Sequence, residues 1–220
     1  MSDRIPGLTG LDVESSDGRM EVVTQPGAGF ALPSPIGSFP AVPMDGGATV
    51  ARIITNVTRD WSPPTPRATP EIVVHGRSLT EVFDALNRLR EWGEGGGMLR
   101  TDAVPSGTSP TVTVVAHANL VLRIPRWAEY GSASTAARAE WDQMVAKLRI
   151  HEERHMAIAV EEADNLAAAL MGREISEIPT LVTDANRTLR QRQDQMDADT
   201  NHGANPGVAY GDVILDTSIP

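Results

Sequence analysis

The first half of the chain alternates β-branched runs with one helical pattern. Three runs rich in valine, isoleucine and threonine predict strands: residues 48–61, 71–76 and 111–127. The last of these is one long strand or a bent pair stopped at Pro125, and MLRTDAV (98–104) is a further strand candidate. Residues 78–93 carry apolar side chains at helical spacing, and GEGGG (93–97) is predicted to end that helix in a turn.

The second half changes to alanine, arginine and glutamate and predicts two helices. The first runs from about Ser134 to Met171, where Gly172 is a plausible stop. Pro179 opens the second helix, which returns antiparallel to the first and ends at about Met196. The sequence therefore predicts an α+β fold, in which a small antiparallel sheet with one helix precedes a long helix and its antiparallel return helix.

Residues 1–47 differ from the rest of the chain because they are rich in glycine, proline and serine and have no periodicity. We expect an arm with a possible partner of its own, followed by a single domain over residues 48–220. The net charge of −10 argues against a nucleic-acid partner, which would require a basic surface. The chain has no cysteine, which excludes disulfides and thiolate zinc sites.

The N-terminal residues lack the basic and apolar regions of a Sec signal peptide. No apolar stretch approaches the roughly 18 to 20 residues that cross a bilayer, so we expect no membrane span. The composition leaves the location open between the cytoplasm and export by a route other than Sec.

The long predicted helix carries the strongest chemical signal, the sequence HEERH at 151–155. His151 and His155 are four residues apart and therefore lie on one helical face, where both imidazoles can reach one zinc ion. Glu152 is rotated by about 100 degrees from His151, so it can reach a water on the metal rather than the metal itself. This spacing is that of the H-E-x-x-H zinc hydrolases.

A catalytic zinc needs a third protein ligand and an open position. Four nearby acids are weak candidates for this ligand. Glu161 and Glu162 continue the same helix and are predicted to be solvated charges, and Glu174 and Glu177 lie in the turn between the two helices. His202 follows the return helix, which brings its loop back toward the histidine pair, and is the leading candidate. His75 and His117 fall in β segments and are predicted to be structural.

Three motifs occur in a fixed order: RIPRW (123–127), WDQMVAKLRIHEERH (141–155) and DADTNHG (197–203). With them the chain resembles the bacterial family described as predicted secreted zinc-dependent proteases, long known as a domain of unknown function. The resemblance implies a zincin-like metallopeptidase with Zn²⁺ held by His151, His155 and His202 and with Glu152 as the catalytic base. It also implies that Asp197 and Thr200 support the ligands from behind or shape their loop.

In such an enzyme Glu152 would take a proton from water and deliver it to the leaving amine of a protein or peptide substrate. Tyr210 is the candidate donor to the developing oxyanion, because it is the tyrosine nearest in sequence to His202. The alternative function is a non-catalytic structural or interaction module of a phage particle or secretion assembly, which the arm would suit. An open metal position beside Glu152 favours catalysis, and a filled one favours a structural role.

Overall fold

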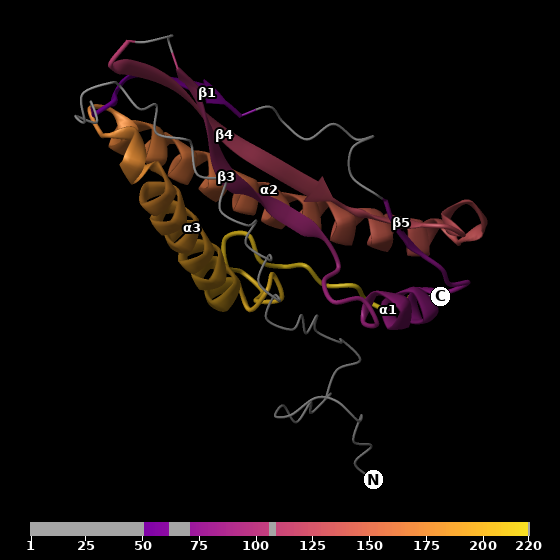
Figure 1. The fold of residues 1–220 in the computed structure, drawn as a ribbon. Coiled ribbons are helices and arrows are strands. Elements are labelled where there is room, and N and C mark those ends of the chain that lie inside the picture. The colour runs from indigo at the N-terminus through magenta and orange to yellow at the C-terminus, as the bar shows by residue number, and fades with distance from the viewer. Residues whose placement is uncertain (1–50, 62–70, 106–108, 220) are drawn as a thin grey trace.

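A computed structural model describes residues 51–61, 71–105 and 109–219 of the chain, and the predicted arm over residues 1–47 lies outside them (Figure 1). The elements in chain order are β1 (Ile53–Asp60), β2 (Ile72–Val74), α1 (Leu79–Leu86), β3 (Glu94–Pro105), β4 (Thr111–Arg123), β5 (Pro125–Trp127), η1 (Tyr130–Ser132), α2 (Thr135–Leu170), η2 (Ile175–Glu177) and α3 (Ile178–Thr200). The mixed α+β class is as predicted. The long β segment is the bent pair, β4 and β5.

The main sheet has the strand order β1-β4-β3 and is mixed. β3 pairs antiparallel with β4, whereas β1 pairs parallel with β4, and β2 pairs parallel with β5 in a second small sheet. The prediction of an antiparallel sheet is therefore wrong for two of the three pairings. Parallel pairs need long crossover connections, and apolar alternation within a strand carries no information about the direction of its partner.

The two long helices agree with the prediction at three of their four ends. α2 is 36 residues long and begins after Ser134, whose Oγ accepts a hydrogen bond from the amide of Ala137 at 3.1 Å. α3 has Pro179 in its first turn, but it continues past Met196 to Thr200. Asp197 and Thr200 are consequently helical residues, held in a fixed orientation by α3.

The helix predicted over residues 78–93 is shorter, because α1 ends at Leu86. Trp92 still reaches the core from the loop that follows, where its ring lies edge-on to Phe83 at a centroid distance of 5.6 Å. In the sequence, Trp92 extends the helical pattern by another turn, but in the structure it is a buried loop residue.

The glycine-rich segment GEGGG is not a turn, because Glu94 begins β3. A β-carbon at Gly95 would lie 2.1 Å from the carbonyl oxygen of Glu152 on α2. Only a residue without a side chain allows the strand and the helix to approach this closely. These glycines therefore place the strand directly against the HEERH turn.

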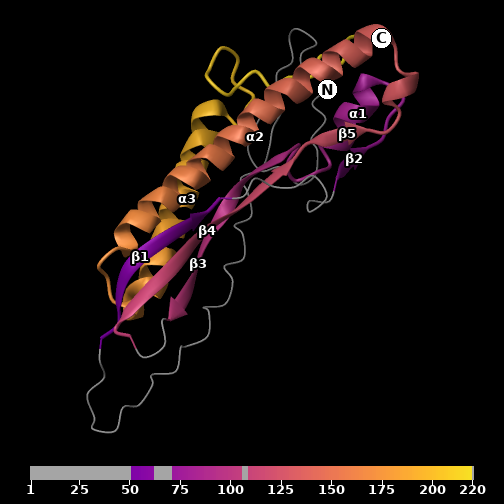
Figure 2. The same cartoon turned by 90° about the horizontal axis from the view of Figure 1, so that it is seen from above.

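α2 packs on one face of the main sheet, and α3 lies beside α2 and contacts β3 (Figures 1 and 2). The buried apolar residues form two clusters, one around α1 and the first half of α2 and one between the sheet and the helices farther along. Leu148 belongs to the first cluster and Ile158 to the second. The HEERH turn lies between these two residues, so its polar side chains occupy the junction of the two cores.

Candidate metal centre

His151 and His155 project from one face of α2 and are both buried, with exposed fractions of 4 % and 6 %. Their Nε2 atoms lie 3.2 Å apart, and the two rings are nearly perpendicular. The i, i+4 spacing has therefore brought the two nitrogens to one point, as the sequence predicts.

Asp197 adds a third donor atom from α3. Its Oδ1 lies 3.0 Å from Nε2 of His155 and 3.4 Å from Nε2 of His151. In a tetrahedral zinc site with bonds near 2.0–2.1 Å, neighbouring ligand atoms are about 3.3 Å apart. Among the described residues, this trio is the group of histidines and acids whose ligand atoms converge enough to hold a metal ion, and the spacing fits zinc.

A hydrogen bond at Nδ1, the ring nitrogen that faces away from His155 and Asp197, fixes the orientation of His151. Its Nδ1 lies 2.9 Å from the backbone carbonyl oxygen of Tyr210, which can only accept, so Nδ1 carries the proton. In the neutral ring the Nε2 lone pair is then directed toward His155 and Asp197. Gly203 lies beside this ring, and it has no side chain because its φ is +85° and a β-carbon there would lie 2.9 Å from Cγ2 of Val213.

His202 lies at the margin of the trio. Its Nδ1 is 3.9 Å from Oδ1 of Asp197, and its backbone adopts the left-handed conformation with φ 53°. The buried Thr200 shapes this turn, because its hydroxyl donates to the carbonyl of Met196 at 2.8 Å and accepts from the amide of Gly203 at 3.1 Å. The structure thus brings His202 to the edge of Asp197, whereas Asp197 itself contacts both imidazoles.

Glu152 is buried at the contact between α2 and β3, with an exposed fraction of 7 %. A β-carbon at Gly93 would lie 2.8 Å from Oε1 of Glu152, so the carboxyl group faces this glycine. Burial raises the pKa of Glu152 to about 7. The carboxyl group can therefore hold or release a proton near neutral pH.

The charges of the trio perturb one another. Burial alone would raise the pKa of Asp197, but hydrogen bonds from His151 and His155 lower it well below its ordinary range. Burial opposes protonation of His151, but the Asp197 carboxylate, the charge of Glu152 and the Tyr210 carbonyl together outweigh it, so the pKa of His151 is raised. A cation, either a proton or a metal ion, is favoured among these atoms.

Residues 72–203 match the family described as bacterial protein of unknown function, DUF922. The match covers more than half of the chain. The chain belongs to DUF922. No curated protein and no solved structure matches it.

The predicted membership of a bacterial family of unknown function is confirmed. The DUF922 description mentions neither proteolysis nor a zincin-like fold. The DUF922 segment contains His151, Glu152, His155 and Asp197 and ends one residue after His202. It excludes β1 and Tyr210. In the described part of the chain, no helix combines the length and apolarity needed to cross a membrane.

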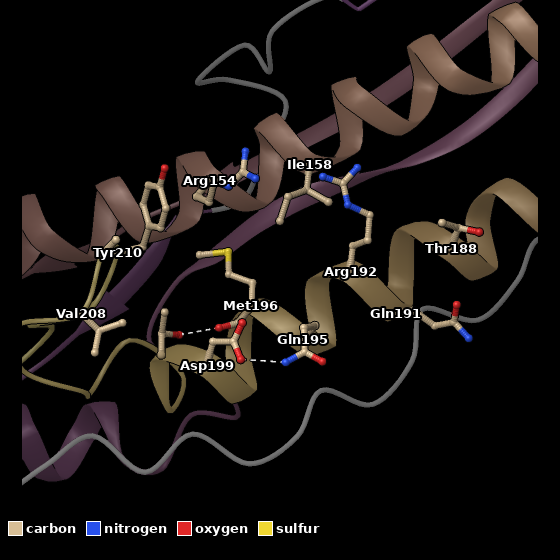
Figure 3. Close-up of a pocket in the computed structure, with 12 residues that line it drawn as sticks. Arg154, Ile158, Thr188, Gln191, Arg192, Gln195, Met196, Asp199, Val208 and Tyr210 are labelled. Atoms are coloured by element: carbon tan, nitrogen blue, oxygen red, sulfur yellow. Dashed lines mark hydrogen bonds between the residues drawn. The ribbon is translucent and has the colours of Figure 1, made fainter.

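Tyr210 lies outside the DUF922 segment, and its backbone and its side chain make different contacts. The carbonyl accepts from His151, whereas the residue as a whole is 42 % exposed and the guanidinium of Arg154 lies over its ring, 5.7 Å from the ring centroid (Figure 3). The ring lines an outer groove of about 510 Å³ between α2 and α3. Its prediction as an oxyanion donor receives no support from this placement.

One prediction about the neighbouring acids is wrong. Glu162 is not a solvated charge but is buried, with an exposed fraction of 5 %, and accepts hydrogen bonds from Arg192 and Asn165. The adjacent Glu161 is exposed, as expected, and pairs with Arg154 and Arg192. The partner of Glu162 lies on α3, which is why the sequence of α2 alone gives no sign of its burial.

Sequence reasoning did not identify Glu91, which precedes β3. Burial raises the pKa of its carboxyl group, the charge of Arg90 lowers it, and the charges of Glu94 and Asp197 raise it further. The local sequence features that could have drawn attention to Glu91 are the neighbouring Trp92 and the glycines that follow it. Of the two histidines predicted to be structural, His75 pairs with Glu129, and His117 lies between Asp60 and Asp102.

Proposed function

We propose that this chain is a zinc-dependent metallopeptidase that hydrolyses peptide bonds of a protein or peptide substrate. The observation that carries the proposal is the convergence of Nε2 of His151, Nε2 of His155 and Oδ1 of Asp197 within 3.4 Å of one another. The buried carboxyl group of Glu152 follows the first of these ligands directly in sequence. Two imidazoles, one carboxylate and a neighbouring acid are the parts of a hydrolytic zinc site.

His151 and His155 supply two of the proposed ligands, and the end of α3 supplies the third. The resemblance favours His202 for this place, whereas the distances favour Asp197, because His202 is 3.9 Å from the carboxylate oxygen that already contacts both imidazoles. Three ligands from this set would leave one tetrahedral position open for a substrate.

A bound zinc ion would supply Lewis acidity, which polarises a carbonyl and acidifies water. The role of Glu152 is to take a proton from the attacking water as the new carbon–oxygen bond forms. Glu152 then returns this proton to the amine nitrogen as the carbon–nitrogen bond breaks. Its pKa near 7 suits both transfers, since the group can accept and release a proton at neutral pH.

A structural metal site is the second candidate, and the position of His202 favours it. If His151, His155, Asp197 and His202 all bind the ion, a tetrahedral site is filled and no position remains for a substrate. The chain would then be a metal-stabilised module of a larger assembly, without hydrolytic activity.

The test combines zinc analysis with hydrolysis of fluorescently labelled casein by the full chain. We expect one zinc ion per wild-type chain and measurable cleavage. Glu152→Gln should retain zinc and lose about 10²- to 10⁴-fold in rate, the range for removal of a general base. Loss of zinc in Asp197→Ala or in His202→Ala identifies the third ligand.

Three results would count against the catalytic proposal. Wild-type protein prepared with ample zinc could hold none, or Glu152→Gln could cleave casein as fast as wild type. A chain that holds zinc, cleaves nothing and loses the metal in both Asp197→Ala and His202→Ala would be the structural module instead.

A further inference from the structure

His202 lies at the end of α3, directly beside the proposed ligand Asp197. Its backbone amide donates to the carbonyl of Asp197 at 2.7 Å, and its Nδ1 lies 3.9 Å from Oδ1 of the same residue. The His202 side chain is 26 % exposed, so its ring has a surface that a substrate can reach. Among the residues that the structure describes, none forms a hydrogen bond with either ring nitrogen, which leaves the imidazole available to a ligand.

The backbone that carries His202 has a conformation that residues with a β-carbon adopt rarely. Asn201, His202 and Gly203 are three successive left-handed residues, with φ values of 47°, 53° and 85°. The first two each cost roughly 1–2 kcal/mol in this conformation. Hydrogen bonds hold the turn in place, among them one from the amide of Ala204 to the carbonyl of Asn201 at 3.0 Å. Backbone strain of this kind clusters at functional sites, and its effect here is to hold the imidazole at Asp197.

The distances separate His202 from the proposed ligands. Donor atoms around one tetrahedral zinc ion lie about 3.3 Å apart. The atoms of His151, His155 and Asp197 keep to this spacing, with separations of 3.0, 3.2 and 3.4 Å. Among the described residues, the donor atoms that converge within 4.8 Å of one another are those of this trio, without His202. His202 thus lies just outside the ligand set, where a group contacts whatever occupies the open position.

We propose that His202 is a further catalytic residue, whose imidazole N–H donates a hydrogen bond to the oxygen of the scissile carbonyl as that oxygen becomes negatively charged. This inference rests on the proposed peptidase function. The role does not depend on titration of the ring, because neutral and protonated imidazole both carry an N–H. The donor acts mainly in the transition state, where the oxygen gains its charge. His202 thus takes the role predicted for Tyr210, whose ring lines the outer groove (Figure 3).

The experiment compares His202→Gly with the matched control Asn201→Gly in the zinc-loaded full chain. Both positions are left-handed, so glycine removes each side chain without straining the backbone, and Asn201 is exposed. With a quenched fluorescent peptide as substrate, His202→Gly should lose about 100-fold in kcat with KM within about threefold, as for the loss of one oxyanion donor. Asn201→Gly should stay within about twofold of wild type. His202→Gln, whose amide can also donate, should regain about tenfold of the loss.

Three readouts other than activity separate this role from metal binding. His202→Gly should hold as much zinc as wild type. Its Co²⁺ form should have the wild-type visible absorption spectrum, because the ligands are unchanged, whereas Asp197→Ala should alter that spectrum. In the inactive Glu152→Gln background, calorimetry should show that His202→Gly weakens binding of a dipeptide phosphonamidate, which mimics the charged oxygen, by about tenfold.

Each contrary outcome bears on one claim. If His202→Gly loses zinc or alters the Co²⁺ spectrum, His202 is a ligand and the inference is overturned. If wild type cleaves the peptide and His202→Gly equals Asn201→Gly in kcat, the role of His202 is overturned and the peptidase proposal stands. A lower kcat with unchanged phosphonamidate affinity would make His202 a positioning residue for Asp197 and also overturn the donor role. If wild type holds zinc but neither cleaves peptides nor binds the phosphonamidate, the peptidase function fails and the inference fails with it.

Discussion

Two charged clusters lie on the same α2–α3 interface and differ in how their charges are matched. In the first, Glu161 and Glu162 of α2 meet Arg192 of α3, and Arg154 adds a second guanidinium to Glu161. In the second, His151 and His155 meet Asp197, and the buried Glu152 lies beside them. The α2 members of both clusters come from one charged stretch of sequence, residues 151–162.

The first cluster is complete within the protein, because each carboxylate has a guanidinium donor. The second directs two imidazole nitrogens and a carboxylate oxygen at one point, where they need a shared proton or a metal ion between them. A cluster that satisfies itself stabilises the fold, whereas one that needs a proton or a metal ion from outside can bind and react. This difference, rather than burial or charge count, separates the candidate metal centre from a structural ion pair.

The largest expected effect breaks the self-contained cluster. Arg192→Met leaves the buried Glu162 without its guanidinium, and the free energy of unfolding should fall by about 3 kcal/mol, because an unpaired buried charge is strongly destabilising. Urea unfolding at pH 7 measures this loss.

The matched control is the double variant Glu162→Met/Arg192→Met, which removes both charges and should recover most of that stability. If the single variant unfolds at the wild-type urea concentration, Glu162 is effectively solvated and the comparison between the two clusters is broken.

The second effect sharpens the comparison from the metal side. Zinc at 100 times its dissociation constant should stabilise the wild-type chain by about 2.7 kcal/mol and raise its Tm accordingly, because the ion binds only the folded arrangement. His155→Ala should abolish this shift. Differential scanning fluorimetry with and without zinc provides the measurement.

The Glu162→Met/Arg192→Met variant should keep the zinc-dependent shift, since the two clusters use different residues. A lost shift in that variant would mean that the ion pair is part of the metal centre. An equal shift in His155→Ala would place zinc elsewhere on the molecule.

Whether the sequence predicts a feature depends on how far apart in the chain the interacting residues lie. The convergence of His151 and His155 is a property of one helical turn, so their spacing is enough to predict it. The burial of Glu162 depends on Arg192, and the parallel pairing of β1 depends on a strand that lies beyond α1 and β3. No local period encodes these partners.

The features of the metal centre also divide into those that local sequence predicts and those that depend on distant segments. His202 could be proposed from its place after the return helix, but the shorter approach of Asp197 depends on α3 continuing to Thr200. GEGGG resembles a turn in sequence because glycine also permits turns. Its actual role, contact between β3 and the backbone of Glu152, becomes visible only when the helix is in place.

The smallest expected effect concerns Glu161, the exposed member of the self-contained cluster. Hydrogen bonds from Arg154, and next from Arg192, hold the pKa of Glu161 below its ordinary value of 4.5. A lowered pKa means that the carboxylate contributes stability above the unfolded-state pKa and loses it as the pH falls through the folded-state value. Because Glu161 is exposed, Glu161→Gln should cost less than about 1 kcal/mol at pH 7.

This difference between wild type and Glu161→Gln should shrink as the pH is lowered below about 4.5, and it should also shrink in high salt, which screens exposed pairs. Urea midpoints at pH 7 and pH 4, with and without 1 M NaCl, measure both trends. A difference that grows at low pH, or one unaffected by salt, would mean that Glu161 acts through burial, as Glu162 does. The self-contained cluster would then be a buried unit throughout, and exposure would no longer separate its two acids.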